Sequence, residues 1–404
     1  MAIDYTLSVE VAWTQELSGV FRIGTSTIDG SDVIAGTFGG NVFDTIPTSS
    51  AGGDAWVMRV EISRGRNSES LFMEHGRCRI VLADPDGIYN HLNPASSLAG
   101  YLVPMRPVRV RATYDGTTYG RFYGYISRIE HDPVARESYL ECVDLFEWLA
   151  TQTPTIASTG ATTVGAAIGL VLDAVEFTDP ALRSLDTGRA IADFSAGGTL
   201  SALALIGSLI AYDRGACFVA GDGIFTFQAG ETRYQRTASA ATFTGSLISQ
   251  VKTAIDVNQI VNRQKVTKTG GAEQEAEDDD SRRDYSYRDG GAITSAYFAS
   301  DAEALSLAKW LVILQANGRP PVRGVALINS SADKITQQFT RGIGDVVTVT
   351  EDRGGTDYLG TIEAIQETHR PGSILRSTFL IPERTVQAFV IGLSTIGSTD
   401  RIYW

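Results

Sequence analysis

The stretch PVRVRATYDGTTYGRFYGYISRIEHDP at 107–133 decides the fold, because DVVTVTEDRGGTDYLGTIEAIQETHRP at 345–371 repeats its pattern. The two stretches have equal length and align with a two-residue shift at the turn. Each contains a V-x-V strand, a glycine-bearing turn, a Gly-x-Ile motif that begins at Gly124 or Gly360, and a histidine shortly before a proline. A glycine inside a strand marks a bulge or a close backbone approach. We interpret the two stretches as copies of one antiparallel β domain.

The first copy lies in a region with the two-residue period of half-buried strands, from Trp56 to Ala150. Asp-Gly turns at 86–87 and 115–116 separate the strands, and 144–150 has the pattern of a short closing helix. We therefore assign 57–150 to a first tube-like β domain.

The second copy falls in a domain that we place at 241–383. Ser300 and Glu303 form a capping box, which predicts a helix over 301–316. Three strands are predicted after it, at 345–350, 358–367 and 374–381.

Residues 151–240 have a different character, with apolar residues at helical spacing after Val164 and after Thr199, a predicted N-cap. Asp222-Gly223 lies between two apolar runs and predicts a hairpin. The predicted fold class is mainly β: two tube-like antiparallel β-barrel domains flank an α+β middle domain.

The polar run at 270–291 contains six acids between Glu273 and Asp280. A solvated loop is the favoured interpretation, because such charge runs rarely pack. A divalent cation site is the alternative, but the glycine-bearing spacing of a calcium loop is absent.

The chain ends carry a second, shorter repeat, FRIGTSTIDGSDVI at 21–34 and FVIGLSTIGSTDRI at 389–402. Each copy predicts a strand-turn-strand clasp that flanks one of the β domains, so 1–56 is assigned to an N-terminal strand and clasp segment and 384–404 to a C-terminal clasp. The repeats and turns together supply the candidate interface positions. They are Phe21, Ile23, Asp32, Asp84, Asp86, Gly87, Gly124, Gly360, Phe389, Ile391, Asp400, Tyr403 and Trp404.

Composition narrows the class of protein. The 404 residues are 43% hydrophobic, no apolar run is long enough to span a membrane, and the first residues do not read as a secretory signal. A net charge of −13 argues against a DNA-gripping surface, which needs clustered Lys and Arg. An acidic wall would instead repel DNA that passes through a channel.

The three cysteines lack the spacing of a disulfide framework or a zinc site.

Common catalytic signatures are absent from the sequence, which predicts no enzyme, no cofactor and no metal. Asp84 and Asp86 could be paired carboxylates or calcium ligands, although a D-P-D-G run is more often a turn. Glu141 and Asp144 receive the same interpretation. A pair of glycosidase carboxylates among the 47 acids remains an open alternative.

Aromatic residues that could stack on host sugars offer an alternative function as a binding module, although a core or interface role is favoured for them. They are Tyr119, Tyr123, Tyr125, Trp148, Tyr403 and Trp404.

A duplicated β domain has a consequence for assembly. Three chains with two copies each would place six copies around an axis, so a trimer could dock on a sixfold ring. Closed rings also cover exposed β edges.

An ordered series of motifs resembles the hub proteins of siphophage tail tips, often called minor tail proteins. The series runs SRGR from Ser63, DPDGIYN from Asp84, RPVRV from Arg106 and FYGYI from Phe122, with DGIF from Asp222 further on. Together with weaker matches, it covers most of 57–383. The lead before Val57 is longer than the family's pattern. We expect no appended lysozyme or peptidase domain, so that cell-wall digestion would fall to other chains.

The resemblance implies a homotrimeric hub, similar to the central hub of contractile tails, located in the virion and assembled in the host cytoplasm. Expected partners are other copies of the chain, the distal tail protein or tail tube ring, the tape-measure protein and tail-fibre proteins, with DNA as passing cargo. A carbohydrate-binding tail module and a tail-associated cell-wall hydrolase remain the alternatives.

Overall fold

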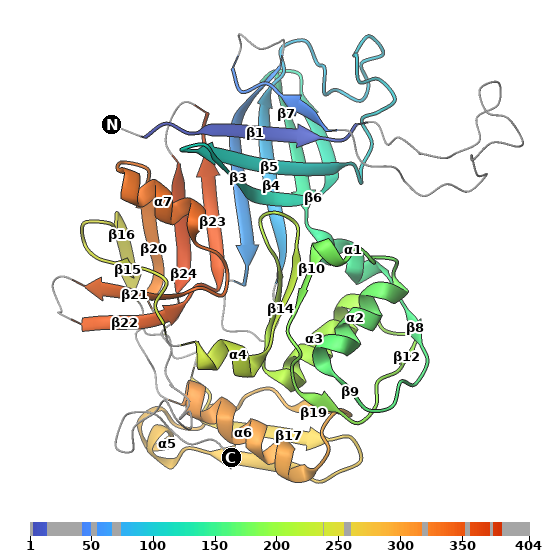
Figure 1. Cartoon of the computed structure of the whole chain (residues 1–404), viewed down its shortest axis with the longest axis vertical. Helices are drawn as coiled ribbons and strands as arrows, with labels where there is room; N and C mark the ends of the chain where they lie inside the picture. The colour runs from blue at the N-terminus through green and yellow to red at the C-terminus, as the bar shows by residue number, and fades with distance from the viewer. Residues whose placement is uncertain are drawn as a thin grey trace, which may run out of the picture.

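The computed structural model describes residues 3–13, 43–49, 55–66, 74–236, 238–253, 260–316, 322–351, 356–371 and 375–381. The fold is mainly β and is dominated by an eleven-stranded antiparallel sheet with the order β16-β20-β24-β23-β3-β4-β7-β6-β5-β1-β2 (Figure 1). Its strands, in chain order, are β1 (Thr6–Val11), β2 (Asp44–Ile46), β3 (Trp56–Gly65), β4 (Glu74–Ala83), β5 (Pro107–Tyr114), β6 (Thr117–Asp132), β7 (Glu137–Val143), β16 (Gln250–Thr253), β20 (Val322–Ile328), β23 (Ala364–His369) and β24 (Arg376–Ile381).

Period-two alternation builds these strands as the sequence predicts. On β4, Cys78, Ile80 and Leu82 are buried, while the alternate residues Arg77 and Arg79 are exposed. One face of the strand therefore meets the core and the other meets solvent. Cys78 lies directly opposite Cys142 on β7, and all three cysteines are buried and free.

A second small sheet completes the second repeat, in the order β15-β21-β22, with bounds β15 (Thr242–Phe243), β21 (Val346–Glu351) and β22 (Thr356–Thr361). In the first repeat β5 pairs with the first half of β6, whose second half pairs with β7. In the second repeat β21 pairs with β22, and β23 pairs with β24. The two stretches that decide the fold therefore have the same pairing scheme.

The correspondence extends beyond these stretches. β3 pairs with β4, which pairs with β7; likewise β16 pairs with β20, which pairs with β24. All these pairs are antiparallel. The sheet thus contains two four-stranded halves, β3-β4-β7-β6 and β16-β20-β24-β23, joined edge to edge where β3 pairs with β23.

Two strand predictions need correction. The single strand predicted at 358–367 is two strands, because the chain leaves the small sheet after Thr361 and enters the large sheet at Ala364. The two closed barrels are not seen either: within the described residues the pairing runs from β16 to β2 without closing. One continuous sheet takes their place because the β3·β23 pairing joins the two halves.

Residues 145–235 contain helices and short strands. The helices are α1 (Leu145–Thr151), α2 (Val164–Ala174), the 3₁₀ turn η2 (Pro180–Leu182), α3 (Ala202–Asp213) and α4 (Gly230–Gln235). The strands are β8 (Thr155–Ile156), β9 (Thr162–Thr163), β10 (Arg183–Leu185), β11 (Ala190–Ile191), β12 (Ala196–Gly197), β13 (Ala216–Val219) and β14 (Phe225–Gln228).

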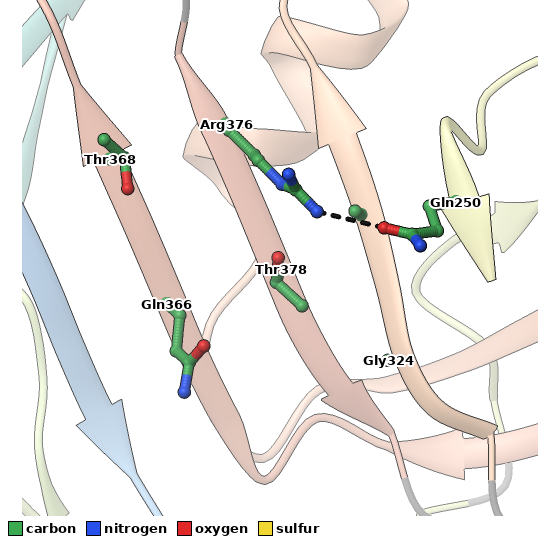
Figure 2. Close-up of a pocket in the computed structure, with 7 residues that line it drawn as sticks. Gln250, Gly324, Gln366, Thr368, Arg376 and Thr378 are labelled. Carbon is green, nitrogen blue, oxygen red and sulfur yellow. Dashed lines mark hydrogen bonds between the residues drawn. The ribbon is translucent and has the colours of Figure 1, made fainter. Parts of the chain in front are cut away.

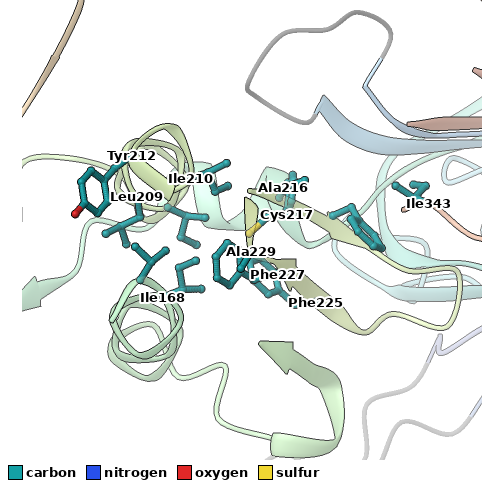
Figure 3. Packing of buried hydrophobic residues seen from close by; sticks show 14 of the residues in the cluster. Ile168, Leu209, Ile210, Tyr212, Ala216, Cys217, Phe225, Phe227, Ala229 and Ile343 are labelled. Atoms are coloured by element: carbon teal, nitrogen blue, oxygen red, sulfur yellow. The ribbon is translucent and has the colours of Figure 1, made fainter. Parts of the chain in front are cut away.

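The core beneath these elements is aromatic and aliphatic. Figure 3 shows Ile168 and Leu209, from α2 and α3, facing Phe225 and Phe227 of the predicted β13–β14 hairpin. The same buried cluster continues into β20 and β21 through Val325 and Val347 and their neighbours, so packing alone does not separate a middle domain from the second repeat.

The tip of the β13–β14 hairpin contacts the large sheet. A Cβ on Gly120 of β6 would lie 2.8 Å from the Cα of Asp222, and a Cβ on Gly221 would lie 2.3 Å from the carbonyl oxygen of Gly120. Two glycines that face each other allow this backbone approach, which fixes the hairpin against β6.

The helix caps differ in one detail from the prediction. Ser300 caps α6 (Asp301–Gln315) and Thr163 caps α2, each with its side-chain oxygen. α3 begins at Ala202 with Ser201 as its N-cap, so Thr199 is not the cap. The Ser201 hydroxyl accepts from the N–H of Ala204, so the cap lies two positions after the predicted one.

The predicted acidic loop at 270–291 is wrong. It contains β18 (Glu273–Glu277) and α5 (Asp279–Tyr285), and with β17 (Arg263–Lys268), β19 (Ile293–Ser295) and α6 it forms a unit between β16 and β20. The acids suit these elements: Lys265 of β17 lies 2.8 Å from Glu273, and Asp278 is the N-cap of α5. The cross-strand ion pair and the helix cap offset the mutual repulsion of these acids, on which the loop prediction is based.

The helix α7 (Ala332–Thr340) follows β20 and lies against it, on the second half of the sheet (Figure 1). Its Ile335 and Phe339 form a buried cluster with Ala112 of β5, and the Tyr119 ring stacks on Phe339 at 5.4 Å. A helix from one repeat therefore packs on the hairpin of the other.

Candidate functional site

The solvent-exposed face of the large sheet is polar where its two halves join. The strand register places five residues in one row across five adjacent strands. From β23 to β6 they are Thr368, Glu61, Arg79, Glu141 and Arg128. Arg79 lies 3.1 Å from Glu141, and both side chains are about two-fifths exposed, at 45% and 39%. Acids and bases therefore alternate along four of the five positions of this row.

The same face has a hollow over the second half of the sheet. Its volume is about 440 Å³, and Figure 2 shows polar side chains around it. Arg376 of β24 donates a 3.0 Å hydrogen bond to Gln250 of β16, across the strand between them. Gln366, Thr368 and Thr378 complete the polar lining. Such a surface can contact water or a polar partner, but it offers no apolar pocket for a small molecule.

A buried ion pair holds the two halves together. Arg121 of β6 pairs with Glu367 of β23, and both side chains are almost fully buried, at 3% and 0% exposed. The guanidinium also donates to the backbone oxygens of Gln338 and Phe339, each at 3.1 Å, at the C-terminal end of α7. A cation at this end favours the helix dipole. Burial opposes the charge of Glu367, but Arg121 and His369 lower its pKa below the usual value.

Two further acidic contacts lie at the same junction. Glu363, between β22 and β23, forms ion pairs with Arg66 at 3.0 Å and with Arg233 of α4 at 2.5 Å. The Tyr5 hydroxyl is 3.0 Å from Nδ1 of His369, which connects the segment before β1 to β23. The junction therefore brings together the N-terminal strand, both repeats and the segment between them.

Among the predicted carboxylates that the structure describes, Asp84 has no exposed surface. It accepts hydrogen bonds from the N–H groups of Ile88 and Tyr89, at 2.7 and 2.9 Å, and from the Ser138 hydroxyl at 2.7 Å. His131 Nδ1 lies 2.9 Å from the same hydroxyl. Asp84, His131 and Ser138 are the residue types of a catalytic triad. Ser138 is buried, however, and its hydroxyl donates to the Asp84 carboxylate. The cluster anchors the 84–106 loop to β7.

The other predicted positions of the D-P-D-G run form a turn. Asp86 is exposed, and the N–H of Gly87, with a φ of +65°, donates to the Asp84 carbonyl oxygen at 3.2 Å. The turn interpretation of this run fits the structure, and the paired-carboxylate alternative does not, because Asp84 and Asp86 point into different environments.

Gly124 and Gly360 occupy matching positions, paired with Val108 and Val347 in the first strand of each hairpin. A Cβ on Gly124 would lie 2.1 Å from the carbonyl oxygen of Val143, so this glycine allows the close approach predicted for it.

The remaining candidate positions lie outside the described residues: Phe21, Ile23, Asp32, Phe389, Ile391, Asp400, Tyr403 and Trp404. The terminal clasp repeat is therefore still a prediction.

Within the described ranges no group of three or more His, Cys, Asp or Glu side chains is arranged to hold a metal ion. In that same part of the chain no helix is long and apolar enough to cross a membrane.

The residues that sequence reasoning missed are the buried charges. Arg121 and Glu367 are 246 positions apart, and no local pattern connects them. Arg64 of β3 is also buried, and desolvation lowers its pKa to about 10. Asp144, which the sequence offers as a possible partner of Glu141, instead caps α1 and accepts from the N–H of Gly76 at 2.7 Å.

Comparison with known proteins gives a result for structure alone. No protein-family model matches the chain, and no curated protein matches it in sequence. A tail protein from Neisseria meningitidis MC58 has a similar structure, with a TM-score of 0.58 and 12% identity, covering 94% of this chain and 97% of that one. The 43 kDa tail protein of prophage MuSo2 from Shewanella oneidensis has a TM-score of 0.55 and 12% identity, with coverages of 85% and 96%. Over nearly its whole length, the chain has the fold of these tail proteins.

Proposed function

We propose that this chain is a structural, non-enzymatic hub of a bacteriophage tail tip, which assembles as a homotrimeric ring around the channel. The observation that carries the proposal is the repeated strand order of the large sheet. Two like halves joined by the β3·β23 pairing make each chain an arc with twofold internal repetition. Three such arcs present six like units, which matches a sixfold tail tube.

The fold comparison supports this proposal, since both solved proteins are named as tail proteins. The proposal includes a siphophage origin, a place in the virion, and contacts with the distal tail protein or tube ring, the tape-measure protein and tail fibres. It also assigns the two β units to 57–150 and 241–383, with 151–240 between them and clasp segments at both ends.

The mixed charge on the solvent-exposed face of the large sheet suits the wall of a channel. Alternating Arg and Glu pairs leave no continuous basic track that would bind the phosphate backbone. DNA and the tape-measure protein would then pass without strong binding. Several acids lie on β18 and α5, in the separate unit between β16 and β20.

The test is the native mass of the purified full-length chain over a range of concentrations. The proposal expects a species with three times the mass of the chain. A chain that stays monomeric at all concentrations, or that forms stable dimers, contradicts the proposal. Digestion of host peptidoglycan in a zymogram would contradict the non-enzymatic part.

A further inference from the structure

The two ends of the eight-stranded part of the sheet have unpaired edges. Within the described residues, β16 pairs with β20 on one side, and its other edge has no strand partner. The second half of β6, after Ile126, pairs with β7, and no strand in the described part of the chain pairs with its other edge. Exposed edges present unpaired N–H and C=O groups that favour the addition of another strand.

The repeat relates these free edges to a junction that is already formed. β16 corresponds to β3, and the second half of β6 corresponds to β23. Since β3 and β23 pair within the chain, the same pairing is available between β16 of one chain and β6 of the next. We infer that neighbouring copies of this chain join by an antiparallel ladder between β16 and 127–132 of β6. This inference rests on the proposed ring.

The internal junction also predicts the register. At that junction Thr368 of β23 lies opposite Glu61 of β3. The strand pairings place Glu130 at the position of Thr368, and Gln250 at the position of Glu61. Glu130 of one chain therefore lies opposite Gln250 of the next.

The side chains at this register agree with the known faces of the sheet. Glu130 is half-exposed on the polar face, and Gln250 is exposed beside the polar hollow. The ladder therefore continues the polar face from one chain to the next. In this register Lys252 falls opposite Arg128, a like-charge pair that would be unfavourable by itself, and Glu130, diagonal to Lys252, offsets it.

The register is tested by cross-linking. The full-length double variant Glu130→Cys with Gln250→Cys is treated with a short bis-maleimide and separated under denaturing conditions. Covalent dimers and trimers are expected from the double variant, and monomers from each single variant, because the three natural cysteines are buried. The matched control is Glu130→Cys with Glu61→Cys, whose second thiol lies on β3, a strand paired on both edges. Equal cross-linking in the control would overturn the register.

A charge reversal tests the same contact without added reagents. Glu130→Lys would place three basic positions together, and we expect at least a tenfold weaker assembly by native mass. The control is Glu147→Lys on α1, because Glu147 and Glu130 are similarly exposed, at 52% and 50%. A wild-type trimer that shows neither the cross-link nor the Glu130→Lys effect refutes this strand pairing and leaves the hub proposal standing. A wild-type chain that forms no trimer refutes both.

Discussion

At the scale of single residues, buried polar groups hold the irregular parts of this fold against the sheet. Asp84 satisfies two backbone N–H groups and one hydroxyl, and Arg121 satisfies a carboxylate and two carbonyl oxygens at a helix end. A buried polar group that loses its partner costs more than the hydrogen bond was worth, because desolvation is no longer compensated.

Replacing Asp84 with Ala should lower the free energy of unfolding by about 3 kcal/mol, because it leaves the N–H groups of Ile88 and Tyr89 and the Ser138 hydroxyl without an acceptor. Asp86→Ala is the matched control, since Asp86 is exposed two positions away, and its effect should stay within about 0.5 kcal/mol. Urea denaturation measures both. Equal effects would show that Asp84 does not anchor the loop.

Asp144 should make stability fall as the pH rises. Burial raises its pKa from 3.8 to about 7, although hydrogen bonds from Gly76 and Phe146 oppose this. Between pH 3.8 and about pH 7 the folded chain therefore binds more protons than the unfolded chain. The stability that the protonated Asp144 contributes is lost as the pH rises through this window, and the loss is complete above the folded pKa. From pH 5 to pH 8 the wild type should lose about 3 kcal/mol more than Asp144→Asn, which does not titrate. Urea denaturation at several pH values that gave parallel curves would contradict this.

At the scale of elements, glycines set how closely strands and hairpins approach. Gly124→Ala would force a Cβ to 2.1 Å from the Val143 carbonyl oxygen, in a strand that is paired on both sides. We expect a loss of at least about 3 kcal/mol in unfolding free energy, or insoluble protein. Gly342→Ala is the control, because no atom lies within 4 Å of its Cβ position, and it should be nearly neutral. Thermal unfolding compares the two, and similar melting temperatures would contradict the close approach.

Sequence patterns predicted elements well where neighbours in the chain determine them. Alternation located β4 and β5, the Asp222-Gly223 turn located the β13–β14 hairpin, and Ser300 located the start of α6. They failed where distant residues decide the structure. The acids of β18 became acceptable through Lys265 on the neighbouring strand, and the break after Thr361 follows from a change of sheet.

At the scale of the whole molecule, the buried Arg121–Glu367 pair connects the two halves of the sheet. No sequence pattern could predict the pair, because it depends on how α7, β6 and β23 meet.

Removing one member of this ion pair leaves the other as an uncompensated buried charge. Arg121→Met or Glu367→Gln should therefore each cost about 3–5 kcal/mol, and the double variant should cost less than their sum. The exposed pair Arg128–Glu130 is the control, and Arg128→Met should cost less than about 1 kcal/mol. Additive effects of the two buried substitutions in urea denaturation would contradict a coupled pair.

The repeat that predicted this architecture from sequence also reappears in the strand order, although as one continuous sheet instead of two closed barrels. A sheet with two like halves and free outer edges is suited to closing with copies of itself, which is the central claim for this chain.

Averaged electron-microscopy images of the assembled full-length chain, viewed along the ring axis, test that claim most directly. We predict threefold symmetry with six similar lobes around an open or filled centre, two lobes from each chain. A ring with a different number of chains, or a threefold particle with only three lobes, would contradict it.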